Sequence, residues 1–112
     1  MFDEQETTKL AYERLPHHCV KALINYIYRG RSVGGFLTAV LRNDLFEACS
    51  SADDKNLPYV SNYSSFLYNY TPSNCWGNVD RVKAWMKMGG LEGQKKLEEQ
   101  KKLEKKLEKV NE

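Results

Sequence analysis

The stretch YIYRGRSVGGFLTAV, residues 26–40, decides the fold because an apolar helical pattern stops inside it and a second one starts. Arg29 suits the last turn of a helix, and Gly30 suits the position just after it. The apolar residues before this turn have the spacing of one helix face: Val20, Leu23, Ile24, Ile27 and Tyr28. Those after it share one face of a second predicted helix, which extends to about Ser50: Phe36, Leu37, Val40, Leu41, Leu45 and Phe46. The stretch therefore predicts a turn that joins two helices.

Two further helices are predicted downstream. Residues 57–70 repeat large side chains at helical spacing, and Pro58 suits the first helical turn. A strand is the competing interpretation, because tyrosine and valine favour sheets. The repeated residues are Tyr59, Tyr63, Phe66, Leu67 and Tyr70. Asn78 suits the cap of a fourth helix that ends at Gly89-Gly90, and its predicted buried face is Val79, Val82, Trp85 and Met86. We predict an all-α fold, a compact bundle of about four short helices with a charged C-terminal helical tail.

Three segments follow from this pattern. Residues 1–14 lack strong periodicity and form an N-terminal arm, either a frayed helix or disordered. Residues 15–90 form the helical domain, and residues 91–112 form a tail rich in lysine and glutamate. The apolar positions of this tail are Leu97, Leu103, Leu107 and Val110, too few for a heptad repeat. A solvated helix is the favoured interpretation and a short oligomerising helix the alternative. We expect a homo-oligomer assembled mainly through the body, with the tail assisting.

Composition narrows the function classes. With 17 basic and 15 acidic residues, the chain lacks the basic excess of a dedicated duplex-DNA binder, so nucleic-acid binding is not favoured. No apolar run approaches the roughly 18 residues of a membrane span. The first residues are acidic and polar, unlike a signal peptide, and the three cysteines form no C-x-x-C pair. We therefore expect a cytosolic protein with reduced thiols, and no membrane partner.

The turn between the first two helices is the candidate ligand site. Free N–H groups at a helix start attract anions, and arginine forms forked hydrogen bonds to phosphate. The residues that would hold a phosphate or an acidic partner are Arg29, Arg31, Ser32, Gly34 and Gly35. The pattern is neither a P-loop nor a dinucleotide fingerprint. An ordinary turn, in which glycine supplies positive φ, is the favoured alternative.

Other candidate residues carry weaker signals. Tyr68 lies off the apolar stripe of its helix and is the expected exposed aromatic contact. His17 and His18 are adjacent, point about 100° apart on a helix and lack a second ligand pair. We therefore predict neither a metal nor a cofactor. Asp44 lies at the edge of an apolar stripe, where we expect it to cap or tether a loop, through Arg31.

Catalysis is the least favoured function. Cys75 would be the nucleophile and a histidine the base, but nothing in the sequence brings them together. We predict instead that Cys19, Cys49 and Cys75 pack as small apolar residues. The chain is not expected to be an enzyme.

The chain resembles known proteins in two stretches. They are residues 34–56, GGFLTAVLRNDLFEACSSADDKN, and residues 66–90, FLYNYTPSNCWGNVDRVKAWMKMGG. The glycine turn, the F-L-x-A-V-L-x-N-D-L motif, the later A-D and the C-W-G triplet resemble a family of small phage-encoded proteins. The match runs from about residue 15 to 90, and the charged tail departs from it. The resemblance implies a bacteriophage accessory protein in the host bacterial cytoplasm, and no catalytic or ligand residue carries over.

The function that follows is a binding protein that antagonises a host process, with anti-phage defence favoured over other host processes. One mechanism is sequestration of a small nucleotide signal, with the arginines on phosphate and a tyrosine on the base. The other mechanism is direct docking on a host protein. The alternative class is a small helix-turn-helix-like nucleic-acid-binding regulator, in which the turn at residues 30–35 is the joint.

Overall fold

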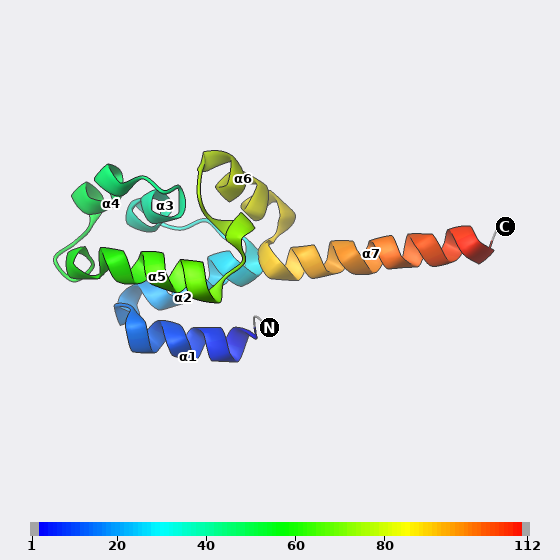
Figure 1. Cartoon of the computed structure of the whole chain (residues 1–112), viewed down its shortest axis with the longest axis horizontal. Coiled ribbons are helices and arrows are strands. Elements are labelled where there is room, and N and C mark those ends of the chain that lie inside the picture. Colours follow the sequence, from blue (N-terminus) through cyan, green and yellow to red (C-terminus); the bar gives the residue numbers. More distant parts are fainter. Residues whose placement is uncertain (1–2, 111–112) are drawn as a thin grey trace.

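The computed structural model describes residues 3–110, and within them every regular element is helical (Figure 1). The all-α prediction is confirmed, but the predicted count of about four is wrong, because seven α-helices lie within these residues. In chain order they are α1 Glu4–Arg14, α2 His17–Arg29, α3 Gly35–Leu41, α4 Leu45–Ser51, α5 Val60–Tyr70, α6 Val79–Met88 and α7 Gly90–Val110. Two single 3-10 turns, Leu57–Tyr59 and Ser73–Cys75, precede α5 and α6.

Helix α2 is the centre of the core. It starts directly after Pro16 and ends where Gly30 takes a left-handed conformation with φ 67°, as the sequence predicts. All five residues of the predicted apolar stripe are buried, and so is Tyr26, which the stripe omits. The hydroxyl of Tyr26 donates a hydrogen bond of 2.6 Å to the Cys75 carbonyl, so this buried polar group has a partner.

The predicted helix from about residue 35 to 50 is wrong, because the chain breaks into α3 and α4. Asn43 adopts a positive φ of 64°, a conformation that asparagine tolerates better than most residues. Asp44 then caps α4 by accepting a hydrogen bond of 3.1 Å from the Glu47 backbone N–H. The break turns Leu45 and Phe46, predicted to be buried, out to 62 % and 88 % exposure.

The helices predicted in the second half are present. Helix α5 buries Tyr63, Phe66 and Leu67, while Tyr59 lies in the preceding 3-10 turn and is exposed. Asn78 caps α6 through the Arg81 backbone N–H at 2.9 Å. On α6 itself Val82 and Trp85 are buried and Met86 partly so, whereas Val79, also predicted to be buried, is exposed.

The N-terminal segment is helical and packs against α2. Asp3 caps α1, and α1 buries Thr7 and Ala11. The Tyr28 hydroxyl of α2 donates a hydrogen bond of 2.8 Å to the Thr7 hydroxyl. Of the two alternatives for this segment, a helix rather than a disordered chain is therefore the one in the structure. Whether residues 15–90 fold without it stays a prediction.

Helix α7 starts in the core and then leaves it. A Cβ added at Gly90 would lie 2.6 Å from the Gly30 nitrogen, so α7 begins in backbone contact with the end of α2. The residues from Lys95 to Lys109 are exposed, and the helix projects away from the body (Figure 1). The described chain therefore extends 62 Å along its longest axis but only 27 and 19 Å along the others. The side chain of Val110 lies outside the described residues.

Candidate functional site

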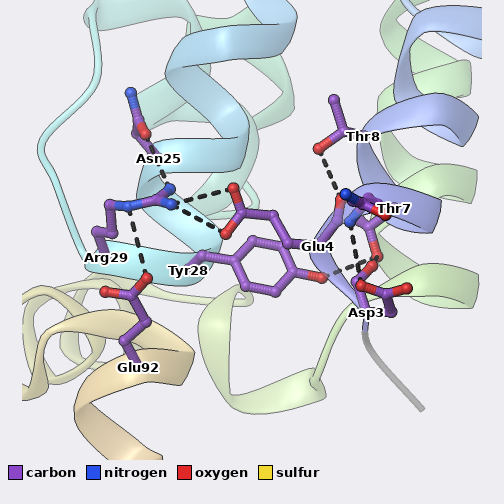
Figure 2. Close-up of polar contacts among 9 residues, drawn as sticks. Asp3, Glu4, Thr7, Thr8, Asn25, Tyr28, Arg29 and Glu92 are labelled. Carbon is purple, nitrogen blue, oxygen red and sulfur yellow. Dashed lines mark hydrogen bonds and ion pairs between the residues drawn. The ribbon is translucent and has the colours of Figure 1, made fainter.

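Arg29, the first residue of the predicted anion site, joins three helices (Figure 2). Its Nη2 donates to both carboxylate oxygens of Glu4, each at 3.0 Å, and its Nη1 donates to Asn25 Oδ1 at 3.1 Å. Its Nε lies 3.6 Å from Glu92 Oε1 at the start of α7. The hydrogen bond to Glu4, and then the charges of Glu4 and Glu92, raise the pKa of the guanidinium. Arg29 is thus already paired with two carboxylates rather than facing an empty turn.

The other four residues of the predicted site form the link between α2 and α3. Arg31, Ser32, Gly34 and Gly35 are all exposed. Gly34 caps α3 with an ordinary φ of −68°, and a Cβ at either glycine would meet open space. The positive φ that the turn requires lies at Gly30 instead. Helix α3 spans only seven residues. Among residues 3–110, no ion pair or side-chain hydrogen bond holds Arg31 toward these glycines.

Tyr68, the predicted aromatic contact, is 75 % exposed and lies at the edge of a groove. Its ring centroid is 6.4 Å from that of Trp76. We call this hollow, of about 200 Å³, the α4–α5 groove. It is lined by Val40, Asn43, Asp44, Leu45, Ala48, Val60, Ser64, Leu67, Tyr68 and Trp76. The exposed ring of Phe46 belongs to the same helix as Leu45, so α4 presents two large apolar side chains to solvent.

The groove combines an apolar floor with one charged side chain, Asp44, in its lining. A basic group lies close by, because Arg81 Nη1 donates to the carbonyl of the lining residue Trp76 at 3.5 Å. The volume lies below the roughly 300–1,000 Å³ of small-molecule sites. The groove therefore suits a few anchoring side chains of a protein partner better than a nucleotide.

A larger hollow of about 610 Å³ lies between the end of α2 and the base of α7. Its lining consists of Tyr28, Pro72, Leu91, Glu92, Gln94, Lys95 and Glu98. Two glutamates oppose one lysine there, so the electrostatic field of this hollow disfavours a phosphate. This hollow therefore has the wrong charge for a nucleotide.

The histidines bind nearby protein groups. His17 Nε2 lies 3.0 Å from the Tyr12 carbonyl, and His18 Nε2 lies 3.2 Å from Asp53 Oδ2. The Asn56 backbone N–H, donating to Asp53, is the main cause of the lowered pKa of that carboxyl, and His18 lowers it further. Within the described part of the chain no group of three or more histidine, cysteine or acidic side chains could hold a metal ion.

The cysteines differ from one another. Cys75 is fully buried, and burial raises the pKa of its thiol to about 11. Its Sγ lies 3.5 Å from the Thr71 hydroxyl. A neutral, buried thiol is a poor nucleophile. Cys19 is partly buried, whereas Cys49 is exposed, so the prediction that all three are packed is wrong for Cys49.

Sequence reasoning missed the groove because it placed Leu45 and Phe46 in the core. A local signal for the break was present. Asparagine adopts the left-handed backbone conformation more readily than most residues, so Asn43 can end a helix. Asp44 and Glu47 are three positions apart, which is the spacing of a capping box. Both features mark a new helix start inside the apolar run.

Comparison of the chain with models of protein families, with curated proteins and with solved structures finds no match. None of the helices within residues 3–110 has the length and apolar character that crossing a bilayer requires.

Proposed function

We propose that this protein is a bacteriophage accessory protein that docks on a host protein in the bacterial cytoplasm and thereby antagonises anti-phage defence. The phage assignment rests on the motif resemblance at residues 34–90. The docking mechanism rests on one observation, the α4–α5 groove with exposed Leu45 and Tyr68 in its lining. Large aromatic and aliphatic side chains at a pocket are typical of residues that dominate binding energy.

Docking is favoured over nucleotide sequestration by the placement of Arg29. Its guanidinium is already paired with the carboxylates of Glu4 and Glu92, whose negative charges disfavour a phosphate beside them. The lining of the groove also indicates the partner. A host surface that presents apolar anchoring side chains would match it, and Asp44 would attract a basic group beside them.

The test compares two exposed surfaces of the same protein. Leu45→Ser with Tyr68→Ala removes two groove side chains, and Leu57→Ser removes an exposed leucine outside the groove. Each variant is expressed in bacteria that carry a defence system, and phage plaques are counted while co-purified host proteins are identified. We expect the wild type and Leu57→Ser to raise plaque numbers and to retain one common host protein. The groove variant should do neither.

Two results would overturn the proposal. One is a groove variant that protects phage as well as the wild type does. The other is calorimetric heat on titration with a nucleotide that disappears in the double variant Arg29→Ala with Arg31→Ala. The second result would establish sequestration by the turn in place of docking.

A further inference from the structure

We infer that His18 is a proton-controlled anchor for the linker of residues 52–56, which joins α4 to α5. When its imidazole ring is charged, it donates a hydrogen bond to Asp53, and when the ring is neutral, it accepts one from Asn56. The inference goes beyond docking on a host protein and does not depend on it, because the purified chain alone tests it. It rests on the positions of these three side chains and of the groups that surround them.

The ring nitrogen Nε2 of His18 lies between two groups of opposite hydrogen-bonding character. Asp53 Oδ2 lies 3.2 Å away, and an ionised carboxylate can only accept a hydrogen bond. Asn56 Nδ2 lies 3.4 Å away, and an amide nitrogen can only donate one. A charged ring has a proton on Nε2, whereas a neutral ring can keep its proton on Nδ1 and leave a lone pair at Nε2. The protonation state of the ring therefore selects the partner.

The side chain of Asn56 is buried and hydrogen-bonded on several sides. It is 4 % exposed, the Tyr63 hydroxyl donates to its Oδ1 at 2.8 Å, and its Nδ2 lies 3.4 Å from Cys19 Sγ. A lone pair on the neutral ring of His18 gives Nδ2 its second acceptor. A proton on that ring removes the acceptor from a buried N–H, which is costly where water cannot replace it. The amide then has to turn or move.

Asp53 and Asn56 are also bonded to each other, so the linker responds as one unit. Asp53 Oδ1 accepts a hydrogen bond of 2.7 Å from the Asn56 backbone N–H, and the Asp53 carbonyl accepts one of 3.0 Å from the Leu57 N–H. The linker begins where α4 ends at Ser51 and leads into the 3-10 turn before α5. Both helices line the α4–α5 groove. A change of partner at His18 therefore acts at the joint between two walls of that groove.

The neighbouring charges leave His18 as the group that responds between pH 5 and 8. The Asn56 backbone N–H, and then the His18 side chain, hold the pKa of Asp53 below its usual range, so its carboxylate stays charged throughout this interval. Within residues 3–110 it is the one carboxylate at ion-pair distance from His18. The other titratable groups at this end of α2 are Tyr12, Glu13, Arg14, His17, Cys19, Asp54, Lys55, Tyr59 and Tyr63. Among these side-chain types only imidazole ordinarily changes charge in this interval, so His17 is the control.

An NMR titration of the purified full chain from pH 5 to 8 tests the exchange of partners. The ¹⁵N signals of the imidazole rings report which nitrogen carries the proton, and the Asn56 side-chain amide and the backbone amides of the linker report the response. We expect neutral His18 to carry its proton on Nδ1. The Asn56 and linker signals should shift with one midpoint in the wild type and in His17→Gln, and these shifts should be lost in His18→Gln. Both histidines are exposed, so both variants should keep the wild-type melting profile at pH 7.

A double-mutant cycle tests the ionic half of the exchange. The cycle combines His18→Gln with Asp53→Asn, which keeps a side-chain oxygen for the Asn56 backbone N–H. The coupling between the two changes, measured from urea melts, should be present at pH 5.5, where imidazole is charged, and absent at pH 8, where it is neutral. Asp54→Asn, an exposed neighbour in the same linker, is the matched control and should show no coupling to His18→Gln at either pH.

Three results contradict the inference. The first is a neutral His18 ring that carries its proton on Nε2, because that ring cannot accept from Asn56. The second is a set of linker signals that titrate in His18→Gln as they do in the wild type. The third is a coupling of His18→Gln to Asp53→Asn that is the same at pH 5.5 and pH 8. No host protein enters these measurements, so a failure of the proposed docking leaves the inference intact.

Discussion

The buried polar atoms of the core are held by a few long-range hydrogen bonds. Trp85 Nε1 of α6 donates to the Tyr26 carbonyl of α2 at 3.0 Å. The Tyr26 hydroxyl in turn donates to the Cys75 carbonyl. Trp76 Nε1 and Cys75 Sγ both lie within hydrogen-bond distance of the Thr71 hydroxyl. The core thus takes in tryptophan and tyrosine without leaving these polar atoms unpaired, which would cost about 1–3 kcal/mol each.

This environment predicts how the three thiols react. The pKa of Cys75, raised from 9.0 to about 11, leaves almost no reactive thiolate at pH 8, and the side chain is also inaccessible. Alkylation of the native protein at pH 8 should label exposed Cys49 first and leave Cys75 unlabelled. Peptide mass spectrometry after a short pulse locates the label. Labelling of Cys75 in denaturant provides the control, and rapid native labelling of Cys75 would contradict the buried position.

Arg29 and Arg31 should differ in their effect on stability. Arg29, 32 % exposed in its side chain, makes a forked pair with Glu4 from another helix, whereas Arg31 is exposed. Arg29→Ala should lower the free energy of unfolding by about 1 kcal/mol, near the upper end for a partly exposed pair. Arg31→Ala is the matched control and should change it by less than about 0.5 kcal/mol. Urea melts measure both, and equal effects would show that the Glu4 pair contributes nothing.

At the scale of helices, the sequence correctly predicted the elements in which the spacing of apolar residues and the capping residues indicate the same boundaries. Helix α2 has both a clean stripe and Gly30 at its end, and α6 has Asn78 at its start and Gly89 at its end. The sequence failed between α3 and α4, where periodicity continued across residues 42–44 but the local capping groups ended the helix. Capping by Asp44 outweighed the burial of Leu45 and Phe46.

The contact between Gly30 and Gly90 is the joint on which α7 depends. Gly90 has a left-handed φ of 70°, and an added Cβ would meet backbone atoms of Arg29 and Gly30 within 2.7 Å. A left-handed conformation alone costs alanine roughly 1–2 kcal/mol, and backbone cannot move aside easily. We expect Gly90→Ala to lower the free energy of unfolding by about 2 kcal/mol or more.

Gly35→Ala is the matched control for this joint. Gly35 starts α3 and has open space around it, so alanine there should leave stability unchanged or raise it by about 0.4–1 kcal/mol. Thermal melts of both variants, followed by circular dichroism, measure the difference. A Gly90→Ala variant as stable as Gly35→Ala would mean that α7 is not seated against α2.

At the scale of the whole molecule, the sequence could not predict where distant residues meet. Glu4 is 25 positions from Arg29, and nothing in a linear pattern pairs them. The groove likewise needs α3, α4, α5 and Trp76 to come together. Exposure of Tyr68 was predictable from its place off the helical stripe, because that inference uses local geometry alone.

The exposed part of α7 should be removable without loss of the fold. Residues 90–94 are buried or partly buried except Glu92, while every residue from Lys95 to Lys109 is exposed. A chain that ends after Gln94 should keep cooperative melting, with circular dichroism lower only by the lost helix. A chain that ends after Gly89 should melt at a lower temperature, because it loses Glu92 and the packing of Leu91. If both truncations melt alike, the first turn of α7 adds nothing to the body.

The reach of α7 also governs how the molecule diffuses. A helix of 21 residues is about 31 Å long, which is half of the 62 Å long axis. Frictional drag on such a rod-bearing particle exceeds that on a sphere of equal mass, so a single chain will leave a gel-filtration column early. Its tumbling will also be faster about the long axis than across it. Elution volume alone would therefore overestimate the number of subunits, and mass-resolving methods are required for this shape.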